Sequence, residues 1–215
     1  MIKKMETRHS IWIRIFHWTN MISITFLILS GFYIHAPESF AIFKNMDNAR
    51  MLHFAMGYLL TFGVIGRIYY AIAAKDAHNI VFNPVTDTPK FPSMIKYYLF
   101  MADSHPYYGK YNPGQKMMYT GWVVMALLMI VTGFVMYNPN VFMAVGGALG
   151  GLMAVRVIHY ITTWLFVLSV VVHVYLDVSE GLPVLLSMFT GKIPADFDHG
   201  THQEAKISSG KSIGA

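Results

Sequence analysis

Histidine is the side chain of this 215-residue sequence best suited to metal or proton chemistry, because the chain has ten histidines and no cysteine. The lack of cysteine excludes thiolate zinc sites, cysteine-held iron–sulfur clusters and a cysteine nucleophile. Polar side chains within membrane-spanning helices are costly and usually functional. Four of the histidines lie in or beside long apolar stretches: His17, His53, His159 and His173.

The spacing of these histidines predicts two separate sites. About four helical turns separate His159 from His173, so both lie on one helix face, roughly 21 Å apart along the axis. That distance is too long for one metal centre but suits two centres stacked across a bilayer. If successive helices alternate in direction, His17 shares a depth with His173, and His53 shares a depth with His159. Membrane depth alone therefore sorts the four histidines into two pairs.

Arginine stands three residues before three of these histidines, as Arg14, Arg50 and Arg156. This spacing places each arginine on the histidine's helix face, on the side of the membrane surface. Arginine pairs well with carboxylates such as haem propionates. A histidine from each of two helices is what a bis-histidine haem needs, so the sequence predicts two such haems. The clusters that a di-iron or zinc site would need, such as Glu-x-x-His within a helix pair, are missing.

The elements that must position these residues are membrane helices. The chain is 55% hydrophobic and 13% charged, with a mean hydropathy of +0.45, whereas soluble domains are about 25% charged. Four apolar stretches are long enough to span a bilayer: residues 15–34, 51–74, 117–137 and 157–176. The sequence predicts an all-α, integral-membrane four-helix bundle over residues 1–181, followed by a C-terminal segment and tail over residues 182–215.

The distribution of positive charge predicts the orientation. All but three of the 16 Lys and Arg residues lie in the N-terminal arm, in the long loop between the second and third spans, at the end of the second span next to that loop, or in the tail. The exceptions are Lys44, Arg50 and Arg156. Both termini and the long loop are therefore expected to be cytoplasmic, in a multi-pass protein of a bacterial inner membrane. Within the long loop, residues 94–102 are expected to form a short helix at the interface.

Several motifs resemble a known family. Residues 14–18 (Arg-Ile-Phe-His-Trp) and 30–32 (Ser-Gly-Phe) resemble the first helix of the b-type cytochrome subunits of respiratory NiFe hydrogenases and formate dehydrogenases. Residues 49–54, 67–70 and 96–100 are similar to the hydrogenase branch, and residues 109–118 also resemble the formate dehydrogenase gamma subunit. His159 and His173 match the family's fourth-helix pattern. The likeness covers about residues 10–180.

The resemblance implies that the pairs His53/His159 and His17/His173 bind two b haems. It also implies a quinone, menaquinone or ubiquinone, beside the cytoplasmic haem, where Asn112, Gly114 and Gln115 occupy the matching positions. The side-chain amides and the glycine N–H could donate to a quinone carbonyl. Pro113, within the same stretch, has no backbone N–H and removes one donor. Without the resemblance, residues 111–115 read as a turn before a helix.

The expected function is electron transfer from the iron–sulfur subunit of a periplasmic NiFe hydrogenase, through the outer and then the inner haem, to the quinone pool. The expected partners are that iron–sulfur (small) subunit and a catalytic subunit, because this chain can hold neither clusters nor nickel; no nucleic-acid partner is expected. The alternatives are the same role in a formate dehydrogenase or a thiosulfate or other sulfur-compound reductase, a His-lined proton channel, and a plain membrane anchor. The sequence assigns no role to His35, His199 or His202.

Overall fold

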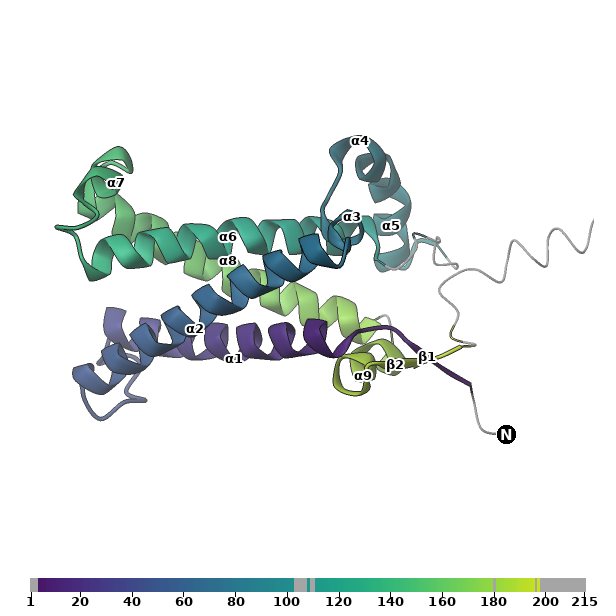
Figure 1. Ribbon diagram of the computed structural model, residues 1–215, viewed down its shortest axis with the longest axis horizontal. Coiled ribbons are helices and arrows are strands. Elements are labelled where there is room, and N and C mark those ends of the chain that lie inside the picture. Colours follow the sequence, from purple (N-terminus) through teal and green to yellow (C-terminus); the bar gives the residue numbers. More distant parts are fainter. Residues whose placement is uncertain (1–3, 103–107, 109–110, 180, 196, 198–215) are drawn as a thin grey trace, which may run out of the picture.

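Four long helices form the body of the computed structural model, which describes residues 4–102, 108, 111–179, 181–195 and 197. They are α1 (Ile11–His35), α2 (Met46–Ala73), α6 (Pro113–Tyr137) and α8 (Gly151–Ser179), and each is long and apolar enough to cross a membrane. Helices make up 76% of the described residues, so the predicted all-α, multi-pass class is confirmed. Figure 1 shows the four helices running along the long axis of the molecule.

All four helices begin earlier in the sequence than the apolar stretches do, because polar residues and turns outside those stretches start them. The side chain of Ser10 accepts a hydrogen bond from Ile13 N at the start of α1, and that of Asn45 accepts one from Asn48 N at the start of α2. α8 follows the short helix α7 (Met143–Ala148) through Gly150 and Gly151, whose φ values of 92° and 88° favour glycine.

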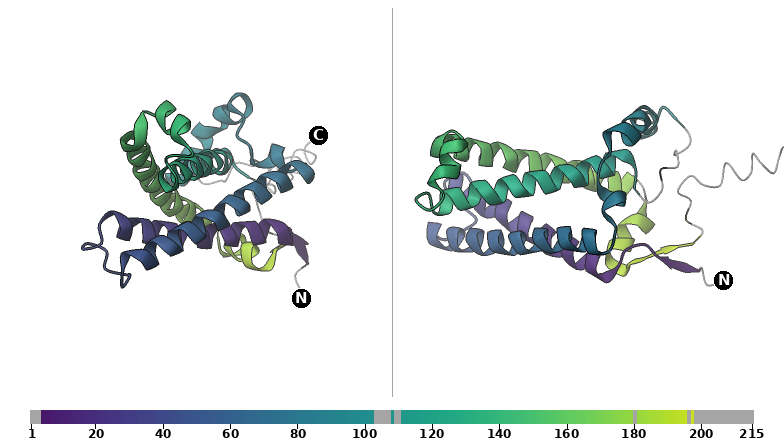
Figure 2. Two further views of the ribbon diagram at one scale, coloured as in Figure 1. Left: turned by 60° about the vertical axis from the view of Figure 1, so that its left-hand side comes forward. Right: turned by 45° about the horizontal axis from the view of Figure 1, so that its top comes forward.

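The helices pack as two hairpins, α1 with α2 and α6 with α8 (Figures 1 and 2). Small residues allow a close approach within the first hairpin, where Asn20 of α1 faces Gly63 and Phe16 faces Gly66. Between the hairpins lies an apolar middle layer of buried side chains from three helices: Leu60, Val64, Ala126 and Phe166. This layer separates one end of the bundle from the other.

The loop between α2 and α6 folds into short helices at the end of the bundle that also carries β1 (Figure 1). These are α3 (Ala77–Ile80), α4 (Pro84–Asp87), the 3₁₀ turn η1 (Thr88–Lys90) and α5 (Phe91–Tyr98). The expected helix over 94–102 is therefore present but begins and ends earlier. The chain leaves it through Phe100, whose φ of 58° is left-handed and cannot continue a right-handed helix.

A buried carboxylate ties this loop to α6. Asp87 is 1% exposed, accepts a hydrogen bond from Asn83 N at 2.9 Å, and lies 3.4 Å from Lys116 Nζ and 3.9 Å from Lys90 Nζ. Burial opposes ionisation of Asp87, but the Asn83 N–H and the two ammonium groups outweigh it and lower the pKa of the carboxyl. The ionised Asp87 therefore holds α4 against the start of α6.

The first part of the C-terminal segment folds back onto the N-terminal arm. Its helix α9 (Leu182–Thr190) leads into strand β2 (Lys192–Pro194), which pairs antiparallel with β1 (Met5–Thr7). Trp18 Nε1 donates to the Met188 carbonyl of α9 at 3.1 Å. The described ends of the chain thus lie at the same end as α3–α5, and the cytoplasmic location of that end stays a prediction. His199, His202 and the rest of the predicted tail lie outside the described residues.

Candidate functional site

The four membrane histidines lie as two facing pairs, one towards each end of the bundle. The ring centroids of His53 on α2 and His159 on α8 are 6.5 Å apart, and those of His17 on α1 and His173 on α8 are 6.4 Å apart. The ring planes make an angle of 56° in both pairs. The structure thus brings together the residues that the sequence pairs by depth. We refer to His53/His159 as the outer pair and to His17/His173 as the inner pair.

The separation within each pair fits a shared metal ligand. At 6.4–6.5 Å between centroids, the two rings cannot hydrogen-bond each other directly. Two nitrogen–metal bonds of about 2 Å, together with the radii of the two rings, account for such a distance. The same near-equal spacing occurs twice, at sites joined by one face of α8. Both pairs are therefore dimensioned to hold one metal ion between two imidazoles, as a bis-histidine haem requires.

The outer pair has a hydroxyl group behind each ring. Ser30 Oγ of α1 lies 2.9 Å from His53 Nδ1, and Thr132 Oγ1 of α6 lies 2.8 Å from His159 Nδ1. Ser30 and Thr132 are fully buried. Sequence reasoning did not assign either hydroxyl to the site. The signal that could have found them is the hydroxyl–glycine dipeptide in each helix, Ser30-Gly31 and Thr132-Gly133.

The inner pair has a different environment. His173 Nε2 lies 3.4 Å from Asp177 Oδ2, one helical turn further along α8. The rings of Trp122 and His173 meet edge to face, with their centroids 4.9 Å apart, and Trp122 Nε1 donates to Ser169 Oγ at 2.7 Å. The Nδ1 atom of His17 is buried and has no hydrogen-bond partner among the described residues. A buried ring nitrogen without a protein partner is consistent with a site built for a ligand.

Of the three arginines predicted to bind propionates, one contacts the C-terminal segment and two are exposed near the outer pair. The guanidinium of Arg14 donates to the carbonyls of Met188 and Phe189 in the last turn of α9, so it holds the C-terminal segment against α1. Arg50 and Arg156 are exposed. Each lies about one helical turn before its histidine of the outer pair, towards the N-terminus of α2 or α8. The propionate role stays a prediction for all three.

The residues expected to meet a quinone are used in the start of α6. Asn112 accepts from Gln115 N at 2.8 Å, and Gln115 Oε1 accepts from Asn112 N at 3.0 Å, which together form a capping box. Gly114 N lies 3.3 Å from Met94 Sδ, and Asn112 Nδ2 donates to the Tyr98 hydroxyl at 3.0 Å. Asn112 and Gln115 are both buried, and the capping box that they form fixes the start of α6.

Replacing Gln115 with alanine is expected to lower the free energy of unfolding by about 1–2 kcal/mol, because the buried N–H of Asn112 loses its acceptor. Thermal unfolding in detergent measures this loss. Gln115→Glu is the matched control, since its carboxylate can still accept from Asn112 N but cannot donate to a quinone. An unstable Gln115→Ala beside a stable Gln115→Glu would confirm the cap. Full stability of Gln115→Ala would contradict it.

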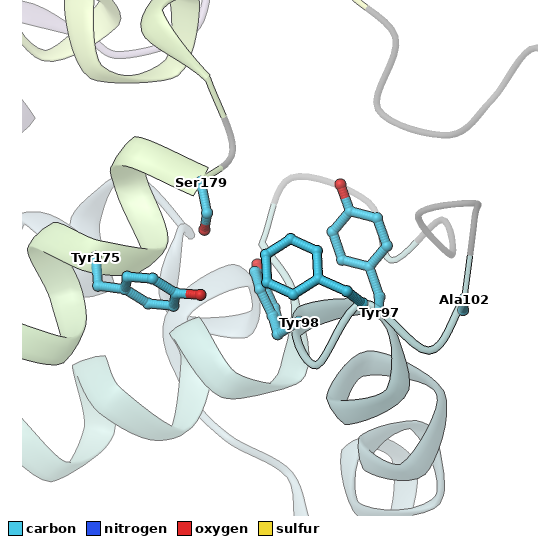
Figure 3. Close-up of a pocket in the computed structure, with 6 residues that line it drawn as sticks. Tyr97, Tyr98, Ala102, Tyr175 and Ser179 are labelled. Carbon is cyan, nitrogen blue, oxygen red and sulfur yellow. The ribbon is translucent and has the colours of Figure 1, made fainter.

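A cleft of about 280 Å³ lies between α5 and the end of α8 (Figure 3), at the same end of the bundle as the inner pair. Its lining is mostly aromatic: Tyr97, Tyr98, Phe100, Ala102, Tyr175 and Ser179. Figure 3 shows the Tyr175 hydroxyl pointing towards Tyr98. Tyr98 carries the hydroxyl that accepts from Asn112, so the predicted quinone residues stand directly behind this wall. The sequence analysis did not predict this cleft.

Comparisons with known proteins find similar membrane cytochromes. A family model described as prokaryotic cytochrome b561 matches residues 8–191. A protein of Azotobacter vinelandii named probable Ni/Fe-hydrogenase B-type cytochrome subunit is 32% identical over 189 residues, covering 79% of each chain. A Cupriavidus necator protein of the same name is 30% identical, covering 79% of this chain and 78% of its own. The probable Ni/Fe-hydrogenase 1 B-type cytochrome subunit of Escherichia coli K12 is 25% identical and covers 92% of this chain and 91% of its own.

Proposed function

The chain belongs to the prokaryotic cytochrome b561 family, a family of membrane electron-transfer cytochromes, and from this premise we propose that it carries two b haems and passes electrons from a hydrogenase to quinone. His53 and His159 would hold the outer haem, and His17 and His173 the inner haem. When bound, the haems supply one-electron redox chemistry. The protein contributes the ligands, their orientation and the apolar surroundings.

The observation that carries this proposal is the repeated histidine pair at one near-constant spacing, 6.5 Å and 6.4 Å. A His-lined proton channel would also place histidines in a membrane. Such a channel needs polar groups or water between its histidines, whereas the middle layer of Leu60, Val64, Ala126 and Phe166 packs apolar side chains there. A plain anchor would need no paired imidazoles. Electron transfer through two haems therefore accounts best for the arrangement.

The proposed electron donor is the iron–sulfur subunit of a Ni/Fe hydrogenase, associated with its catalytic subunit. The names of the similar proteins favour hydrogenase over formate dehydrogenase or a sulfur-compound reductase. By the positive-inside pattern, the end carrying α7 faces the periplasm. The outer pair lies towards that end, and the exposed Arg50 and Arg156 flank it. The partner would dock there, so that electrons enter at the outer haem.

The proposed electron acceptor is a quinone whose ring occupies the cleft between α5 and α8. Aromatic walls suit a flat ring, and the hydroxyls of Tyr98 and Tyr175 could donate to its carbonyls. Tyr175 is two residues and Ser179 six residues beyond His173, so the α8 wall of the cleft lies about 3–9 Å beyond that histidine along the helix axis. Asn112 and Gln115 would then act by fixing the start of α6 and, through Asn112, the Tyr98 hydroxyl.

The direct test is a reduced-minus-oxidised spectrum of the protein purified with its catalytic partner. We expect b-type bands and about two haems per chain, because the four histidines form two pairs. The same preparation identifies the partner by mass spectrometry of the co-purifying subunits. Histidine pairs without b-type bands in cells supplied with haem would contradict the proposal and favour a proton channel. Co-purification of a formate dehydrogenase would overturn the choice of partner only.

A further inference from the structure

We propose that Ser30 and Thr132 are positioning residues that fix His53 and His159 as Nδ1–H tautomers, so that Nε2 of each ring is the atom offered to the iron. This inference deepens the proposed function and rests on it, because it concerns the partners of the outer haem's ligands. It is carried by hydrogen bonds among this chain's own residues. The two hydroxyls come from α1 and α6, and the two rings from α2 and α8.

The hydroxyl proton of Ser30 is already used within α1. Ser30 Oγ lies 2.5 Å from the Phe26 carbonyl and 3.3 Å from the Leu27 carbonyl. Carbonyl oxygens only accept, and a serine hydroxyl has one proton to donate. At the 2.9 Å contact with His53, Ser30 Oγ therefore accepts and Nδ1 donates. A neutral imidazole protonated at Nδ1 has its lone pair on Nε2.

Thr132 repeats this arrangement in the second hairpin. Its Oγ1 lies 2.7 Å from the Leu128 carbonyl and 3.2 Å from the Met129 carbonyl, which take up its proton. At 2.8 Å from His159 Nδ1, Thr132 Oγ1 therefore accepts. Both rings of the outer pair are thus protonated on the nitrogen that faces the neighbouring helix and free on the other nitrogen.

A glycine follows each hydroxyl and faces the ring, and at residue 31 the missing side chain makes room for it. A Cβ atom built on Gly31 would lie 3.3 Å from His53 Cε1, and one on Gly133 would lie 3.7 Å from His159 Cε1. The first distance is tight enough that any side chain at residue 31 would press on the imidazole. Each hairpin therefore supplies the same half-site, with a hydroxyl–glycine dipeptide on one helix facing a histidine on the next.

The consequence is a difference between the two proposed haem sites. An Nδ1–H that donates a hydrogen bond fixes the rotation of the ring and makes the ligand more electron-donating. The outer ligands have hydroxyl acceptors, whereas His173 of the inner pair lies 3.4 Å from the carboxylate of Asp177. Second partners of this kind adjust the reduction potential of a haem. The two haems should therefore respond separately to changes at Ser30 and Thr132.

The test compares Thr132→Val with Thr132→Ser in the complex purified with its catalytic partner. Valine keeps the shape but removes the hydroxyl, whereas serine keeps the hydroxyl and loses a methyl group. We expect Thr132→Val to raise the midpoint potential of one haem, a shift of roughly threefold to tenfold in its reduction equilibrium, or up to about 59 mV. Its low-spin electron paramagnetic resonance signal should shift as well, and the other haem should be unchanged. Thr132→Ser should match the wild type.

Matched controls come from buried hydroxyls that bond only a carbonyl of their own helix among the described contacts. Thr162→Val on α8 controls for Thr132→Val, since Thr162 Oγ1 donates to the Ile158 carbonyl at 2.8 Å. Ser23→Ala controls for Ser30→Ala on α1, because Ser23 is equally buried and donates to the Thr19 carbonyl at 2.8 Å. The control variants should leave both potentials unchanged.

Each outcome separates the inference from the proposed function. The positioning role is supported if Thr132→Val and Ser30→Ala each shift the midpoint potential of one haem or lose that haem. Thr132→Ser and both controls should keep two haems with unchanged potentials. Two haems with unchanged potentials and signals in every variant overturn the inference and leave the proposed function standing. A Thr132→Ser that behaves like Thr132→Val also overturns it, because packing rather than the hydroxyl would then be responsible. A wild-type protein without b haem overturns the proposed function itself.

Discussion

Replacing His173 with alanine is expected to abolish quinone reduction while leaving the outer haem in place. His173 faces His17 at 6.4 Å and stands within about two turns of the cleft proposed for quinone. Removing one of the two histidines proposed to hold the inner haem should lower the haem content from about two to about one per chain. Quinone turnover should fall at least about a hundredfold, because losing only a hydrogen-bond partner of a metal ligand already costs up to about that much. Reduction of an artificial dye by the partner enzyme should be largely retained.

The measurement is the haem content of the purified complex, together with hydrogen-dependent quinone and dye reduction. His159→Ala is the companion variant, and it should remove the outer haem and isolate the inner one from the partner. His35→Ala is the control, since this histidine is the last residue of α1 and its ring stacks on that of Tyr160, with the centroids 4.5 Å apart, instead of facing a second histidine. It should keep both haems and both activities. Normal quinone turnover in His173→Ala would refute the assignment of the inner pair.

The helices and the histidine pairs could be predicted because both depend on simple periodicities. Apolar length identifies a spanning helix, and the direction of each successive helix sets the depth of its residues. Depth and helical phase together placed His17 beside His173 and His53 beside His159, as the structure does. Helix ends were harder to place, because caps such as Ser10 and Asn45 are polar residues outside the apolar stretches.

The surroundings of the histidines could not be predicted in the same way, because they depend on which helices become neighbours. Ser30 and Thr132 reach histidines on adjacent helices, and no periodicity within one helix reveals such a contact. The amides of Asn112 and Gln115 illustrate the opposite difficulty. Their spacing of three residues is that of a capping box, whereas the family resemblance of residues 109–118 implies a quinone site. The structure gives the first role directly, and the second is now proposed to act through Tyr98.

Filling the cleft is expected to block quinone without disturbing either haem. Ser179 lies on the cleft wall near the end of α8, and Ser179→Trp would place an indole, among the largest side chains, in a space of about 280 Å³. If the quinone ring occupies that space, the overlap should raise the KM for quinone by about tenfold or more, which corresponds to at least about 1.4 kcal/mol of lost binding. Both haem spectra and dye reduction should stay at wild-type levels.

Val178→Trp is the matched control, because Val178 precedes Ser179 on the same helix, is 61% exposed and does not line the cleft. It introduces the same indole one residue away and should leave the KM for quinone unchanged. The two variants together distinguish occupation of the cleft from a general effect of a bulky residue at the end of α8. Unchanged quinone kinetics in Ser179→Trp, with the haem content intact, would exclude this cleft. The quinone would then have to bind elsewhere around His17 and His173, without weakening the case for the two haems themselves.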